Sequence, residues 1–195
     1  MSPAASEIVM PTSSTASGSG DASLERYPAA LRAFHWLIVV LLILQFSVAW
    51  TMPHIGRGTV PLGLIAWHLF FGTSILALMV LRFCWRTRVS VPELPTSLPR
   101  VLQSLSRLVH YLLYFGIVLV ALLGWANASS RGWHVKLLGF IPLPAIMPSG
   151  SSLGHRLGDV HATLATALLY LIGFHVAAAL YHTAILKDRL LRRMI

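Results

Sequence analysis

The nine histidines are the side chains of this sequence best suited to chemistry, and most of them lie in apolar surroundings. Four stretches contain no Asp, Glu, Lys or Arg, and each of them holds histidine: 33–56, 58–81, 108–130 and 160–186. A polar ligand inside hydrocarbon is costly, so a histidine at such a position is a candidate functional group by default. Paired imidazoles on neighbouring helices indicate a buried metal centre, and haem is the metal group that suits them best.

The depth of each histidine follows from the direction in which its span runs. If the chain begins in the cytoplasm, His35 lies about one turn inside the cytoplasmic face and His68 lies under the outer face. The fourth span enters from outside, so His161 is outer and His175 is deeper. These levels predict two pairs, with His68 and His161 near the outer face and His35 and His175 near the cytoplasmic face.

The spacing on the fourth span supports two levels. His161 and His175 are 14 residues apart, which is about 21 Å of rise at about 1.5 Å per residue. At about 100° per residue their side chains are roughly 40° apart, so both face one side of the helix. Two haems stacked across a bilayer need this arrangement, and two imidazoles on each iron leave no open position for oxygen, which suits electron transfer. A di-metal transporter and a histidine proton relay stay open as alternatives.

Nearby glycines and arginines fit the same interpretation. Two glycines lie within about one turn of the outer-level histidines, where a missing side chain would let a flat macrocycle approach the backbone. Two arginines precede predicted ligands at the membrane boundary, where they could pair with haem propionates. Helix packing and topology account for these residues equally well. The four candidates are Gly72, Gly158, Arg32 and Arg156. Three further histidines fall in outer loops or at the edge of a span and are expected to be solvated or interfacial: His54, His134 and His155.

The composition places these histidines in a membrane protein. Hydrophobic residues make up 56% of the chain and charged residues 11%, with a mean hydropathy of +0.72. A soluble domain carries about 25% charged residues, so we expect an all-α membrane protein with one bundle of four helices. The predicted spans are 31–52, 62–85, 101–126 and 156–184. The prolines of 90–99 predict a connection without a helix, and the apolar run 137–147 is expected on the outer membrane surface.

The first 28 residues and the distribution of charge complete the topology. Residues 1–28 are rich in Ser, Ala, Pro and Gly and predict a disordered tail rather than a signal peptide, ahead of one transmembrane domain over 29–195. Eleven of the fifteen Lys and Arg residues lie near the termini or in 82–107, so the positive-inside rule places both termini in the cytoplasm. The net charge of +9 therefore reflects topology, and no basic soluble module indicates nucleic-acid binding. The single cysteine, Cys84, permits no C-x-x-C-H attachment, so haem would be held non-covalently.

Four segments of the sequence resemble the bacterial cytochrome b561 family: FHWLIVVLL, WHLFFGTSILALMVLR, HYLLYFGIVLVALLGW and HATLATALLYLIGFHVAAALYH, followed by KDRLLRRM. The similarity covers about residues 26–195. It implies a four-helix bundle of the bacterial inner membrane enclosing two b-type haems, with four iron ligands: His35, His68, His161 and His175. The chain departs from the family pattern at Ala121, where many members have a proline.

The resemblance also implies partners. Family members are similar to quinone-linked electron carriers, with ubiquinone as redox substrate, and one branch resembles superoxide:quinone oxidoreductases. His110 and His182 match further histidines of the family pattern, and they are candidates for the quinone site because neutral imidazoles there could bond a quinone oxygen or relay its protons. Hydrogen bonding at a helix end is the alternative role.

Three classes of function follow. The leading one is a di-haem cytochrome carrying electrons across the inner membrane between the quinone pool and a periplasmic donor or acceptor. Oxidation of superoxide is one subtype of this function, because the basic outer face would attract a small anion, as it would equally attract anionic lipid headgroups; its cations are Arg57, Arg131, Lys136 and Arg156. The second is a membrane-anchor haem subunit for a separate soluble redox partner. The third, a non-haem metal or proton transporter, predicts acidic or thiol co-ligands, which the charge-free stretches lack. Membrane lipid is a partner in all three, and the oligomeric state is not indicated.

Overall fold

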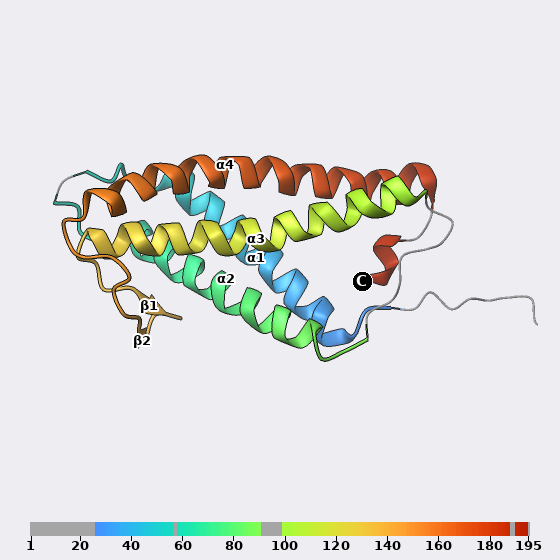
Figure 1. The fold of residues 1–195 in the computed structure, drawn as a ribbon, viewed down its shortest axis with the longest axis horizontal. Helices are drawn as coiled ribbons and strands as arrows, with labels where there is room; N and C mark the ends of the chain where they lie inside the picture. The colour runs from blue at the N-terminus through green and yellow to red at the C-terminus, as the bar shows by residue number, and fades with distance from the viewer. Residues whose placement is uncertain (1–25, 57, 91–98, 188–189, 195) are drawn as a thin grey trace, which may run out of the picture.

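The computed structural model describes residues 26–56, 58–90, 99–187 and 190–194, and four long helices dominate it (Figure 1). These are α1 (Ala29–Thr51), α2 (Leu64–Arg86), α3 (Arg100–Ser130) and α4 (Ser152–Tyr181). All four are long and apolar enough to cross a membrane, which confirms the predicted all-α fold class with four spans. The predicted tail up to residue 25, Arg57 and most of the predicted connection 90–99 lie outside the described residues.

The limits of α1 and α2 lie within two residues of the sequence prediction, whereas α3 and α4 are longer. α3 continues beyond the predicted end at 126 to Ser130, and α4 begins before the predicted start at 156, at Ser152. The side chain of Ser151 accepts a hydrogen bond from the amide of Gly154 at 3.3 Å, which caps the start of α4. The added turns pack together, because Ser130 lies against Gly154 and both residues are buried.

The four helices form two pairs, because α1 packs along α2 and α3 packs along α4, while α2 also contacts α3. Among the described residues, no Cα atom of α4 lies within 8 Å of a Cα atom of α1 or α2. Figure 1 shows the pairs close together near β1 and β2 and diverging toward the end where the chain terminates. Side chains of α4 that face α1 or α2 therefore reach across an interval between the pairs.

A small apolar core joins all four helices. Its buried members are Ile38 of α1, Ile75 and Met79 of α2, Ile117 of α3 and Leu168 of α4. Leu168 lies midway along α4 between His161 and His175, seven residues from each. The core thus forms an apolar layer between the two histidine levels that the sequence predicts.

The loop between α3 and α4 contains a small hairpin, which the sequence did not predict. Strand β1 (Lys136–Leu137) pairs antiparallel with β2 (Ile141–Pro142), and the turn contains Leu138 and Gly139, both with positive φ. The hydroxyl of Thr73 in α2 donates to the carbonyl of Lys136 at 3.2 Å, which holds the hairpin on the bundle. Exposed apolar side chains lie at its tip, so the expected position of 137–147 at the outer membrane surface stays a prediction.

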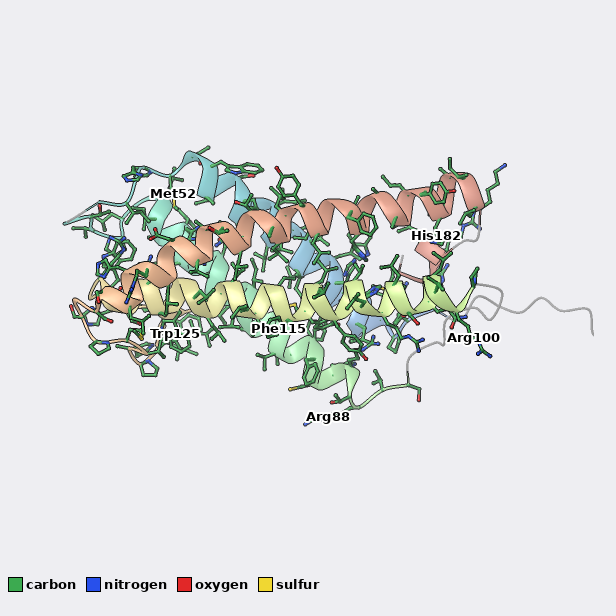
Figure 2. All side chains as sticks on the ribbon, turned by 45° about the horizontal axis from the view of Figure 1, so that its top comes forward. Met52, Arg88, Arg100, Phe115, Trp125 and His182 are labelled. Carbon is green, nitrogen blue, oxygen red and sulfur yellow. The ribbon has the colours of Figure 1, made fainter. Side chains whose placement is uncertain are left out.

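The described ends of the chain meet at one end of the bundle. α4 continues into a π-helical turn, η1 (His182–Leu186), and a 3₁₀ turn, η2 (Leu190–Arg193), follows. The indole N–H of Trp36 donates to the carbonyl of Met194 at 2.8 Å, and the amide of Tyr27 donates to the carbonyl of Arg193 at 3.1 Å. Figure 2 shows Arg88, Arg100 and His182 toward this same end, and Met52 and Trp125 toward the opposite one.

Candidate functional site

The structure brings His68 of α2 and His161 of α4 close together, edge to face, across the interval between the helix pairs. Their ring centroids are 6.1 Å apart, and the ring planes are inclined by 80°. Both side chains are half-buried. These are the two residues that the sequence placed together at the outer level.

The third helix orients His161. Its Nδ1 lies 2.8 Å from the carbonyl oxygen of Val120, and because a carbonyl only accepts, the ring donates from Nδ1 and keeps Nε2 as a lone-pair donor. A Cβ atom at Gly124 would lie 2.9 Å from Cε1 of this ring, so only glycine leaves room for it. A ligating histidine usually donates its other nitrogen to a carbonyl or carboxylate in this way. Sequence reasoning missed both residues of α3.

The first helix supplies a partner for His68. Nε2 of the Gln45 amide lies 3.2 Å from Nε2 of His68, while Nδ1 of His68 is buried with no hydrogen-bond partner among the described residues. Because an amide nitrogen only donates, Nε2 of His68 accepts this bond and Nδ1 carries the proton of the neutral ring, so the lone pair that a metal would take is the one that Gln45 bonds. A Cβ atom at Gly72 would lie 3.4 Å from Gln45, so this predicted site glycine leaves space for the amide beside His68.

The distance between the two rings of the outer pair is compatible with haem. An imidazole nitrogen lies about 2 Å from a first-row metal, which puts the centroids of two rings on opposite sides of one metal about 6 Å apart. A bare ion needs three or four protein ligands, and among the described residues no group of three or more His, Cys, Asp or Glu side chains could hold one. A porphyrin supplies four nitrogens itself, so two histidines suffice.

Three histidines gather at the inner level. The rings of His110 in α3 and His175 in α4 are 5.2 Å apart between centroids and inclined by 85°. His35 of α1 lies near both of them. Nδ1 of His110 lies 2.6 Å from the carbonyl oxygen of Ser106, one turn earlier in its own helix. The sequence predicted the association of His35 with His175 and did not predict that His110 packs against His175.

The other predicted site residues lie around these two levels. Arg32 is half-buried one turn before His35, Arg156 is exposed near the start of α4, and His182 is half-buried at the start of η1. The space beside Gly158 is filled by the Asn127 side chain, since a Cβ atom there would lie 2.7 Å from its Cγ. Helix packing therefore accounts for Gly158, and it does not face an open space for a macrocycle.

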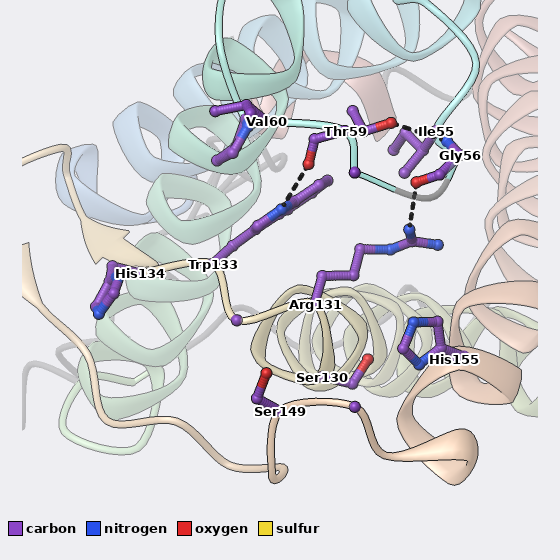
Figure 3. A pocket seen from close by; sticks show the side chains of 14 residues that line it. Ile55, Gly56, Thr59, Val60, Ser130, Arg131, Trp133, His134, Ser149 and His155 are labelled. Carbon is purple, nitrogen blue, oxygen red and sulfur yellow. Dashed lines mark hydrogen bonds between the residues drawn. The ribbon is translucent and has the colours of Figure 1, made fainter.

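The outer loops enclose a pocket of about 980 Å³ (Figure 3). Arg131 lies in it, with its guanidinium over the Trp133 ring at 5.7 Å and donating to the carbonyl of Gly56 at 3.3 Å. His134 and His155, which the sequence placed in solvated loops, also line this pocket and are exposed. The lining combines polar and apolar groups, and Arg131 is a cation within it.

The fold defines a membrane protein with four candidate spans, in which histidines of different helices lie close together at two levels. Residues 26–195 match the model of the family described as prokaryotic cytochrome b561. The chain therefore belongs to the prokaryotic cytochrome b561 family, and it is a membrane b-type cytochrome of electron transport.

Three relatives are similar over nearly their whole length. The chain is 28% identical to the probable superoxide oxidase CybB of Yersinia pestis, over 88% of this chain and 96% of that protein. It is 26% identical to cytochrome b561 homolog 1 of Escherichia coli, over 88% of this chain and 98% of the relative. Identity to cytochrome b561 homolog 2 of the same organism is 25%, over 88% and 92% of the two chains.

Proposed function

We propose that this cytochrome holds two b-type haems and carries electrons across the bacterial inner membrane between ubiquinone and a periplasmic donor or acceptor. The observation that carries the proposal is the arrangement of histidines at two levels, with the outer rings 6.1 Å apart and a buried apolar core between the levels. When bound, the haems supply one-electron redox chemistry at each level.

The proposed ligand pairs are His68 with His161 and His35 with His175. Each pair joins α4 to a helix whose Cα atoms stay more than 8 Å away among the described residues, which suits a wide planar group between the rings. His110 lies on α3, which packs directly along α4, and its ring already touches that of His175. His110 is therefore better placed to position His175 or to handle protons than to bind iron.

The residues around the ligands have defined tasks in this proposal. Val120 and Gln45 hold the outer imidazoles in orientation, and Leu168 with its neighbours excludes water between the levels. His110 and His182 lie at the end that carries the chain termini, where they would bond a quinone oxygen and exchange its protons. The basic residues of that end support placing both termini in the cytoplasm.

Superoxide is the outer reductant that we favour within this function. A relative at 28% identity is named a probable superoxide oxidase, and the pocket beside the outer histidines contains Arg131. A cationic entrance concentrates small anions. The second candidate role, a membrane anchor for a separate redox subunit, would be favoured by a protein that co-purifies in fixed ratio.

The test is haem analysis of the purified protein and of single histidine variants. Pyridine haemochrome should give about two unmodified b-type haems per chain. His68→Ala and His161→Ala should each remove the same spectral component, and His35→Ala should remove the other. A folded protein without colour would overturn the proposal, and loss of one shared component in His68→Ala and His35→Ala would overturn the pairing.

A further inference from the structure

Two half-buried arginines lie on membrane helices near the inner histidines, Arg32 of α1 and Arg82 of α2. Arg82 is on α2, directly after the charge-free stretch 58–81, and it is half-buried. A cation within a membrane helix is costly, so such residues face the protein interior and usually have a function. Arg86, one turn later on the same helix, is exposed.

Neutral groups from two other helices hold the guanidinium of Arg82. Its Nε donates to the hydroxyl of Tyr114 in α3 at 2.7 Å, and a terminal nitrogen donates to the carbonyl of Leu31 in α1 at 2.9 Å. The guanidinium carbon also lies 5.8 Å from the centre of the Tyr114 ring. Arg82 thus has a fixed position where α1, α2 and α3 meet.

That position lies beside His35. In an α-helix the carbonyl of residue 31 accepts the amide of residue 35, so Arg82 bonds the same carbonyl that receives the His35 amide. Arg82 is also close enough for its charge to act on His35. At the other end of the bundle, Arg131 lies in the loop pocket, and Lys136 and Arg156 are exposed.

No carboxylate neutralises Arg82 within the described part of the chain. Asp159 is the only acidic residue there, and it lies two residues before His161, at the outer level. The inner level therefore carries a fixed positive charge, and the outer level has the acid nearby. A fixed charge close to a redox centre changes its reduction potential, because reduction adds one negative charge to the site.

We propose that Arg82 raises the reduction potential of the inner haem above that of the outer haem, so that an electron entering at the outer level collects at the inner one. This inference rests on the proposed function of a di-haem carrier. The transfer moves one electron between the two sites and forms or breaks no bond. Tyr114 is a positioning residue in this scheme, because its hydroxyl fixes the orientation of the guanidinium.

The experiment is a redox titration of the purified holoprotein, followed by the optical bands of both haems. Arg82→Gln should shift the equilibrium distribution of the electron at least tenfold toward the outer haem, which is about 59 mV for a one-electron couple. Only the component that disappears in His35→Ala should move. Arg82→Lys keeps the charge and should restore most of the difference.

Two controls separate charge from structure. Arg86→Gln removes an exposed cation from the same helix and should leave both potentials unchanged. Tyr114→Phe keeps the charge but removes its hydrogen bond, so its effect should be smaller than that of Arg82→Gln. If Arg82→Gln loses the inner haem, Arg82→Lys is the test. Because lysine keeps the positive charge, the inner haem of this variant should have a potential near that of the wild type.

The outcomes distinguish this inference from the proposed function. A protein that binds no haem would contradict both the proposed function and the role of Arg82. If Arg82→Gln keeps both haems and their potentials are unchanged, the proposed role of Arg82 is wrong and the proposed function is unaffected. Equal shifts of both haems in Arg82→Gln, or a shift in Arg82→Lys as large as in Arg82→Gln, also contradict it, because a local charge would then not be the cause.

Discussion

At the scale of single residues, histidine orientation depends on groups that carry no chemistry of their own. The carbonyl of Val120 fixes the tautomer of His161, and the missing side chain of Gly124 makes room for its ring. Neither role follows from residue type, because every residue has a carbonyl and membrane helices use glycine widely for packing. The candidate ligands could be predicted from the sequence, because a polar histidine is costly in an apolar span and is rarely found there without a function.

Gly124→Ala should displace His161 and weaken the outer site. The new Cβ would lie 2.9 Å from the ring, so the ring must move from the Val120 carbonyl or the helices must separate. We expect a loss of stability of about 1–3 kcal/mol, as for other overpacked positions, and a lower content of the outer haem. Haem analysis and thermal unfolding measure both effects.

Gly173→Ala is the matched control for this substitution. Gly173 lies on α4 with no atom within 4 Å of the position of its Cβ. Alanine favours the helix over glycine by about 1 kcal/mol, so this variant should be as stable as the wild type or slightly more stable and should keep both haems. Equal haem loss in the two variants would show that contact with His161 is not the cause.

At the scale of elements, the four spans could be predicted and their contacts could not. Charge-free stretches of suitable length determine where helices cross a membrane, which accounts for the agreement for α1 and α2. The extra turns of α3 and α4 depend on the contact between Ser130 and Gly154, and the hairpin depends on the bond from Thr73. Such contacts arise only once the helices have a register against each other.

The same limit applies to the inner level. The position of His110 along α3 predicted its depth, near the termini. The contact between its ring and that of His175 depends on how α3 is rotated relative to α4, which the sequence does not show. The π-helical turn that begins at His182 likewise has no signature in the sequence. The two quinone-site candidates therefore differ in their surroundings, and variants should separate their roles.

His182→Phe should slow oxidation of the reduced haems by quinone while both haem spectra stay unchanged. His110→Phe should slow the same reaction and also alter the inner haem spectrum, because its ring packs 5.2 Å from that of His175. Stopped-flow mixing of the reduced protein with a soluble ubiquinone measures the rates. Unchanged rates in both variants would move the quinone site away from these residues.

At the scale of the whole molecule, the two ends of the bundle differ in what they present to the solvent. One end holds the described ends of the chain and most of the described arginines, including Arg88 and Arg100 (Figure 2). The other end holds the pocket with Arg131, and Lys136 is exposed on the hairpin beside it. Both ends are positive, so the net charge of +9 alone does not identify the entrance for an anion. A reaction at the proposed outer haem would distinguish the two ends.

Superoxide should reduce the oxidised protein within a second, and the reduction should disappear when superoxide dismutase is present. Attraction of an anion by exposed charges is screened by salt, with a Debye length of about 10 Å at about 0.1 M, so the rate should fall as ionic strength rises. The double variant Arg131→Glu with Lys136→Glu should slow the reaction about tenfold at low salt. Lys136→Glu alone should also slow the reaction. The hydrogen bonds described for Lys136 use only its backbone, so this substitution reverses a charge without breaking a described side-chain bond.

The matched control reverses two exposed charges at the opposite end, through Arg88→Glu with Arg100→Glu. This variant has the same net charge as the outer double variant, so a general effect of charge would slow both equally. Steering through the outer pocket predicts that only the outer variant is slow and that high salt removes most of the difference between the two. If superoxide fails to reduce the haem in the wild type, the superoxide role is wrong, and the carrier must take electrons from another outer donor.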